Sequence, residues 1–140
     1  MNRKTPFLTV DIVIFLDGDK IVLIKRANPP FEGLYALPGG FVEYGEKVED
    51  AAVREAKEET GLAVKLQDII GIYSELGRDP RGHVASIVYL AEVVGGHLNA
   101  STDAEEAIKF RFDEIPENLA FDHKDILEDA LKLWRKNKKN

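Results

Sequence analysis

Three glutamates near the middle of the chain, Glu55, Glu58 and Glu59, have the side chains and the spacing of a divalent-cation site. On a helix, at about 100° per residue, their carboxylates fall within one arc roughly 100° wide, on a side that also carries small apolar residues. A solvent-exposed acidic face is the usual explanation of such a run, but it fits poorly where the acids share a side with residues that should pack inward. A hard cation such as Mg²⁺ prefers oxygen ligands and is often shared with substrate phosphates, so it would explain the clustering.

These glutamates belong to a segment that we expect to be helical from Lys47 to Thr60. The segment is rich in Ala, Glu and Lys, and it contains no Pro and no internal Gly. Gly61 follows it and can adopt the left-handed conformation that ends many helices. Within this helix Glu55 and Glu59 lie one turn apart, and no basic residue lies three or four positions from either, so their like charges are left to repel.

The stretch from Gly40 to Leu62 resembles the signature of the Nudix hydrolases, which places glycine, glutamate and arginine at constant spacing. Every fixed position is filled, with Ala56 as a small member of its apolar class: Gly40, Glu46, Arg54, Glu55, Ala56, Glu58, Glu59, Gly61 and Leu62. So many specified positions in one short stretch make a strong signal, unlike a lone glycine motif. The resemblance implies an enzyme that uses water to cleave the diphosphate of a nucleoside diphosphate linked to another group, with Mg²⁺ or Mn²⁺ as its cofactor.

The resemblance also implies roles for the residues of the signature. The implied metal ligands are one backbone carbonyl and three carboxylates: Gly40, Glu55, Glu58 and Glu59. Glu46 and Arg54 resemble the structural pair of the family, which orients the catalytic loop and helix. Arg54 is therefore interpreted as a positioning residue and not as a phosphate ligand.

The general base is left open at this point. In the family it is either a carboxylate of the signature, such as Glu55 or Glu58 here, or a carboxylate from a later loop. Glu105 and Glu106 are the later candidates, just before an apolar segment that reads as a strand. For each of them, a solvated acid on a loop is an equally good explanation.

Four residues outside the signature are candidates for substrate binding: Arg78, Arg81, Phe31 and Tyr35. Two cations on the short loop 77–82 suit contact with phosphate or ribose, although an ordinary surface turn is an equally good explanation. The two aromatic side chains could stack on a base, but packing in the core or at its rim is their more common role.

Two segments indicate the substrate. The loop GRDPRGH and the later segment LAFDH resemble those of small ADP-ribose pyrophosphatases of this family, which predicts cleavage of ADP-ribose to AMP and ribose 5-phosphate. The alternatives are oxidised nucleoside triphosphates, dinucleoside polyphosphates or nucleotide sugars as substrates. The same segments resemble the sensor domain of Nudix-related transcriptional regulators, which bind without hydrolysis. Those regulators carry a DNA-binding module after the Nudix part and tend to lose the signature, whereas it is intact here.

The composition limits the class of protein. The chain has 140 residues, a formal net charge of −6 and no cysteine. Its length predicts one domain, 1–140. The acidic balance argues against nucleic acid as the main partner, because phosphate backbones require basic surface. The lack of cysteine excludes disulfides and thiol nucleophiles. No apolar run approaches the roughly 18 residues of a membrane span, so we expect a cytoplasmic protein with no membrane partner, and by analogy with the family a homodimer.

The apolar runs predict a sheet between helices. The expected strands are Phe7–Leu16, Lys20–Arg26, Ala63–Leu66, Ile69–Glu75, Val84–Val94 and Ile108–Phe112. A last helix should begin after Asp122, the plausible N-cap, and the basic tail from Arg135 should fray. Strands on both sides of one helix, followed by another helix, predict an α/β (α+β) fold with a mixed sheet. The Nudix resemblance implies the same α/β/α sandwich.

Overall fold

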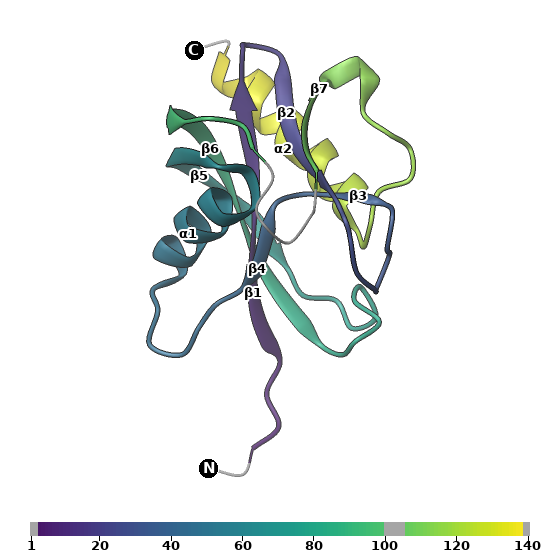
Figure 1. Cartoon of the computed structure of the whole chain (residues 1–140). Helices are drawn as coiled ribbons and strands as arrows, with labels where there is room; N and C mark the ends of the chain where they lie inside the picture. Colours follow the sequence, from purple (N-terminus) through teal and green to yellow (C-terminus); the bar gives the residue numbers. More distant parts are fainter. Residues whose placement is uncertain (1–2, 100–105, 139–140) are drawn as a thin grey trace.

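The computed structural model describes residues 3–99 and 106–138 and shows a mixed sheet with one helix on each face (Figure 1). The elements in chain order are β1 (Phe7–Leu16), β2 (Lys20–Lys25), β3 (Tyr35–Ala36), β4 (Gly39–Phe41), α1 (Val48–Thr60), β5 (Leu62–Tyr73), β6 (Val84–Gly96), β7 (Ala107–Arg111), the 3₁₀ turn Phe112–Glu114 and α2 (His123–Lys138). The predicted α/β/α sandwich is therefore confirmed.

Strand β1 is the centre of the sheet, and its two halves have different neighbours. The strand order is β3-β2-β1-β6-β5, with β1 parallel to β6 and the other pairs antiparallel. On the edge of β1 away from β6, its first half pairs with β4, through Thr9 and Phe41 among others. Its second half pairs with β2 across the turn at residues 17–19. The division lets the short strand β4 bring Gly40, the start of the signature, and the preceding Gly39 into the middle of the sheet.

Helix α1 covers one face of the sheet through small residues. Ala51, Ala52 and Ala56 are fully buried and pack in one cluster with alternate residues of β1, including Ile12. Alanine has the highest intrinsic helix propensity and lets the helix approach the sheet closely. The signature helix is thereby held at short range over the strand that carries Gly40.

Helix α2 covers the other face with larger side chains. Ile126, Leu127 and Ala130 are buried and pack with Val13 of β1 and with Leu23 of β2, within one cluster. The prediction that the chain frays from Arg135 is wrong, because the helix continues to Lys138. Basic residues near a helix C-terminus are favoured by the helix dipole, and the Lys138 ammonium lies 4.3 Å from the Trp134 ring centroid.

Strand β5 is longer than the sequence indicated. The two expected pieces form one strand with three register shifts against β6. Such irregularities interrupt the alternation of apolar and polar side chains, which is why the run reads as two strands. None of the helices within the described ranges is long and apolar enough to cross a lipid bilayer.

Candidate active site

The helix that carries the glutamates has the expected boundaries. Lys47 is its N-cap residue in an extended conformation, and Gly61 ends it at a φ of 79°. The Gly61 N–H donates to the Lys57 carbonyl at 2.9 Å, which gives the last turn a backbone partner. With the alanines buried, Glu55 and Glu59 lie half-buried beside them and Glu58 is exposed. Only two of the three glutamates therefore border the buried side of the helix.

Arg54 fixes the loop that precedes the helix. Its Nε donates to Glu46 Oε2 at 2.7 Å and its Nη2 donates to Glu46 Oε1 at 3.0 Å. The same Nη2 reaches the Phe41 carbonyl at 3.2 Å, at the end of β4. These hydrogen bonds lower the pKa of Glu46 to about 2. The arginine thus ties the loop, strand β4 and the helix together.

The two glycines of β4 lie between two of the glutamates. The Gly39 N–H donates to Glu59 Oε1 at 3.0 Å. Gly40 lies so close to the Glu55 carboxylate that an added Cβ would overlap it. Three of the four residues proposed as metal ligands, Gly40, Glu55 and Glu59, are therefore gathered around one short strand.

Glu58 is joined to this group through Arg54. The Arg54 Nη1 donates to Glu55 Oε1 at 2.7 Å and to Glu58 Oε2 at 3.2 Å. Burial raises the pKa of Glu55 to about 7, and the hydrogen bond with the Glu58 carboxyl adds to the rise, while Arg54 opposes it. Within residues 3–99 and 106–138, no three carboxylates or imidazoles already converge as a closed metal site. Arg54 is the cation that these acids share in this arrangement.

The donor set nevertheless fits a hard divalent cation. Carboxylate and carbonyl oxygens are the ligands that Mg²⁺ and Mn²⁺ prefer, and Mg²⁺ usually keeps several waters in place of a closed protein cage. The absence of a side chain at Gly40 lets the Glu55 carboxylate lie against the backbone of β4, where a Cβ would otherwise be. Gly40, Glu55, Glu58 and Glu59 could therefore hold such an ion together with substrate oxygens and water.

A pocket of about 210 Å³ opens next to these glycines. It is lined by Gly40 and Glu59 on one side and by charged residues of other elements, including Arg78, Asp79 and Arg81. Its size suits one ring or sugar of a nucleotide and not the whole molecule. The pocket thus connects Glu59 with the loop between β5 and β6, which carries two substrate-binding candidates.

Arg78 and Arg81 both lie at this pocket, but each is already paired. The Arg78 guanidinium donates to both oxygens of Asp122, at 2.9 and 2.7 Å, and its side chain is only 5% exposed. Arg81 donates to both oxygens of the buried Asp79, at 3.1 and 2.8 Å. Asp122 precedes α2 as predicted, yet its carboxylate holds Arg78. We therefore interpret Arg78 as a positioning residue.

Sequence reasoning missed a buried polar group in the same pocket, formed by Asp11, Ser86 and His123. Ser86 Oγ donates to Asp11 Oδ2 at 2.5 Å, and the His123 ring lies 3.7 Å from Asp11 Oδ1. The Leu37 N–H donates to His123 Nδ1 at 2.9 Å, which makes that nitrogen an acceptor. Burial raises the pKa of Asp11 to about 7 and lowers the pKa of His123 to about 3. The one available signal was an aspartate inside an apolar strand.

The remaining candidates have different positions. Phe31 lies on the loop after β2, and its ring packs against Phe121 at a centroid distance of 4.8 Å. Tyr35 packs against Phe110 in the core cluster under α2, as its more common role predicted. Glu106 is exposed, and its carbonyl accepts a hydrogen bond from the Lys25 N–H. Glu105 lies outside the described residues.

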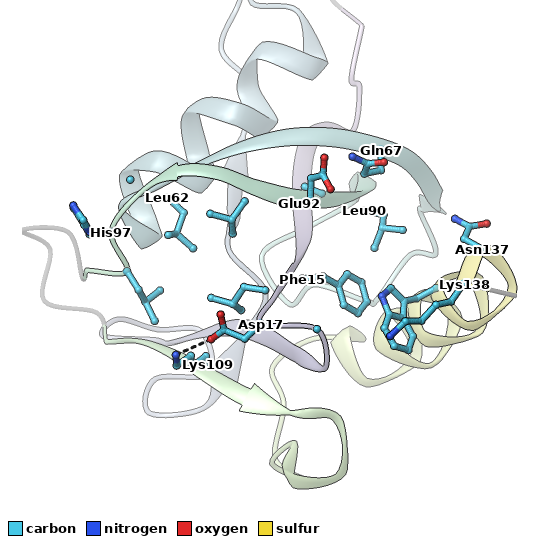
Figure 2. Close-up of a pocket in the computed structure, with 17 residues that line it drawn as sticks. Phe15, Asp17, Leu62, Gln67, Leu90, Glu92, His97, Lys109, Asn137 and Lys138 are labelled. Atoms are coloured by element: carbon cyan, nitrogen blue, oxygen red, sulfur yellow. Dashed lines mark hydrogen bonds and ion pairs between the residues drawn. The ribbon is translucent and has the colours of Figure 1, made fainter. Parts of the chain in front are cut away.

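A larger cavity, of about 840 Å³, lies at the other end of β1 (Figure 2). Its lining comes from the ends of β1, β5 and β6 and from the last turns of α2, and it includes Phe15, Leu62 and Leu90. Figure 2 shows the ion pair of Asp17 with Lys109 at its rim. Of the residues proposed for catalysis or for metal binding that the structure describes, none lines this cavity.

Comparison with known proteins decides the family. The NUDIX domain model matches residues 5–130. This chain belongs to the Nudix family. The Nudix chain is 54% identical over 130 residues to the ADP-ribose pyrophosphatase of Methanocaldococcus jannaschii, which covers 93% of this chain and 75% of that protein. It is 31% identical to the ADPR responsive transcriptional repressor NtrR of Acinetobacter baylyi, covering 92% of this chain and 54% of the repressor.

Solved structures agree with the Nudix assignment. The NUDIX domain of Shewanella oneidensis NrtR complexed with ADP ribose matches with a TM-score of 0.83 at 27% identity, covering 94% of this chain and 90% of that one. A MutT/nudix family protein from Enterococcus faecalis matches with a TM-score of 0.81 at 32% identity. The Nudix chain covers 63% of the length of the Enterococcus chain, so it spans less than two thirds of some of its relatives.

Proposed function

We propose that this Nudix protein is a Mg²⁺-dependent pyrophosphohydrolase that converts ADP-ribose and water to AMP and ribose 5-phosphate. The observation that carries the proposal is the arrangement of Glu55 and Glu59 around Gly39 and Gly40, at the mouth of a pocket of nucleotide-fragment size. The identity to an ADP-ribose pyrophosphatase supports the choice of substrate. Mn²⁺ is the alternative cation, because it accepts the same oxygen ligands.

The proposed reaction needs little covalent chemistry from the protein. A divalent cation held here would neutralise diphosphate oxygens and lower the pKa of a bound water. Arg54 keeps Glu55 and Glu58 in place through its hydrogen bonds, and the Gly39 N–H orients Glu59. The water oxygen bonds to one phosphorus, the bridging P–O bond breaks, and a carboxylate accepts the water proton. That carboxylate is one of the signature glutamates or one of Glu105 and Glu106.

The test uses glutamine variants of the proposed ligands. Glu58→Gln and Glu59→Gln should each reduce Mg²⁺-dependent turnover of ADP-ribose by about 100-fold or more while the fold is kept, because each loses a charged ligand. Products are resolved by chromatography, and the fold is followed by circular dichroism. Glu114→Gln is the matched control, an exposed acid after β7. Equal loss of activity in this control would contradict the proposed roles.

A second candidate is an ADP-ribose sensor that does not hydrolyse its ligand. The likeness to an ADPR responsive repressor and to a Nudix domain complexed with ADP ribose favours it. Tight binding of ADP-ribose with no product in Mg²⁺ would establish this function and exclude the first. A panel that adds oxidised nucleoside triphosphates, dinucleoside polyphosphates and nucleotide sugars tests the remaining substrates in the same assay.

Three further expectations belong to this proposal. Residues 1–140 act as one Nudix domain, the protein forms a homodimer, and it works in the cytoplasm on a small nucleotide. Light scattering of the purified chain measures the dimer, and fractionation of the source cells measures the location. A monomer in light scattering would contradict the expected homodimer.

A further inference from the structure

The Arg81 guanidinium lies near two aromatic rings at the mouth of the small pocket. Its Cζ is 5.3 Å from the centroid of the Phe41 ring and 5.7 Å from the centroid of the Phe121 ring. Both rings line the pocket together with Arg81. They come from β4 and from the segment before α2, so the guanidinium joins two otherwise separate walls.

The Arg81 side chain is held in a fixed plane. Asp79, which is almost fully buried, accepts hydrogen bonds from its Nε and Nη2, and also from the Arg81 backbone N–H at 2.9 Å. The side chain of Arg81 is nevertheless 43% exposed. Its charge is thus already matched by a carboxylate, while part of its surface remains open. This combination suits stacking better than it suits binding of a phosphate.

The segment that carries Phe121 is itself held in place by its neighbours. Phe121 has a φ of 54°, a left-handed conformation that costs an ordinary residue on the order of 1–3 kcal/mol. The next residue, Asp122, is held by Arg78, and His123 accepts from the Leu37 N–H. Such strain persists where the surroundings over-determine it, and it concentrates at ligand sites.

Phe31 supports that wall with the same backbone feature. It has a φ of 61°, and its ring meets Phe121 edge to face. Arg26 fixes the Phe31 loop by donating to the Pro30 carbonyl at 2.6 Å, and its guanidinium lies 5.1 Å from the Phe121 ring centroid. Two aromatic residues in rare conformations are therefore held against each other beside Arg81.

We propose that the exposed face of Arg81, whose plane Asp79 fixes beside Phe41 and Phe121, is the platform on which the nucleobase of the substrate stacks. Bases stack on guanidinium planes and aromatic rings alike. A sugar would instead need free hydrogen-bond acceptors, whereas the Asp79 carboxylate is occupied by Arg81. The assignment rests on the proposed function, and it changes the role of Arg81 from contact with phosphate or ribose to recognition of the base.

The test compares the two products as ligands of the full chain in Mg²⁺, measured by titration calorimetry. AMP carries the base and ribose 5-phosphate does not. Arg81→Lys keeps the charge and loses the plane, so it should weaken AMP binding by about tenfold and leave ribose 5-phosphate binding unchanged. Phe121→Leu should weaken AMP binding in the same selective way, and Phe121→Tyr should restore it.

The matched control is Arg111→Lys, an exposed arginine at the end of β7. It should leave both affinities unchanged, and thermal melting checks the fold of every variant. Unchanged AMP binding in Arg81→Lys, or an equal loss for both ligands, would overturn the proposal, as would a wild-type protein with no preference for AMP. If AMP binding behaves as expected but wild-type protein does not cleave ADP-ribose, the proposed function fails and this inference stands.

Discussion

The cavity beside β4 and the cavity at the far end of β1 differ in their buried charges, and the smaller of these two hollows holds more of them. The larger, about 840 Å³, lies where the sheet ends meet the last turns of α2 and carries the ion pair of Asp17 with Lys109, whose side chains are both about half exposed. The smaller, about 210 Å³, contains the buried groups Asp11, Asp79 and His123. Buried polar groups are costly unless they are paired, so a fold that keeps several in one place indicates a function there.

Strand β1 connects the two hollows and explains the contrast. Thr9 and Asp11, from its first half, line the smaller hollow, and Phe15 and Leu16, from its second half, line the larger. The first half pairs with the short glycine strand β4, and the second half pairs with β2. The volume of a hollow therefore depends on how far the ends of the strands separate. Its buried charges, in contrast, indicate where chemistry is possible.

The largest expected effect comes from adding a side chain at Gly40. Gly40→Ala places a methyl group on the Glu55 carboxylate, which must move, and we expect ADP-ribose turnover to fall by about 100-fold. Overpacking should also lower the free energy of unfolding by about 1–3 kcal/mol. Gly95→Ala, next to the larger hollow, meets its nearest neighbour at 3.7 Å and should change neither quantity. An ADP-ribose turnover assay measures the activity, and urea denaturation measures the free energy of unfolding. Equal losses in the two variants would contradict the difference between the two hollows.

An intermediate effect should separate the two ion pairs. Arg78→Met leaves Asp122 without its partner in a partly buried position and should lower the free energy of unfolding by about 3 kcal/mol. Lys109→Met breaks the exposed pair at the larger hollow and should cost less than about 1 kcal/mol. Both values come from urea denaturation at neutral pH. An equal loss of unfolding free energy in the two variants would show that the two ion pairs do not differ in their contribution to stability.

The smallest expected effect is a pH dependence of stability caused by Asp11. Its folded pKa of about 7 lies above its ordinary value of 3.8, so ionisation costs the folded state nothing below pH 3.8 and its full amount above pH 7. Asp11→Asn should therefore raise the free energy of unfolding by about 2 kcal/mol at pH 8 and leave it nearly unchanged near pH 4. Asn keeps an acceptor for Ser86. A gain that is the same at both pH values would contradict this assignment.

The sequence predicted the local parts of the site and missed those made by distant segments. Helix α1 follows from its composition and periodicity, and the pair of Arg54 with Glu46 is what the Nudix resemblance implied. The contacts of Arg78 with Asp122 and of Ser86 with Asp11 join residues 44 and 75 positions apart, which only the sheet order brings together. Composition carries no information on such pairing. Strand β5 was divided in two for a related reason, since its irregularities depend on its partner β6.

The position of β4 inside the sheet separates residues that are fixed by the framework from residues that lie on replaceable loops. Gly39 and Gly40 are hydrogen-bonded into the central ladder, so the reaction machinery is tied to the framework of the domain. Phe31 and Arg81 instead lie on connecting peptides between strands. Changes in these surface loops can therefore alter the substrate specificity of such a chain while the cleavage step stays the same.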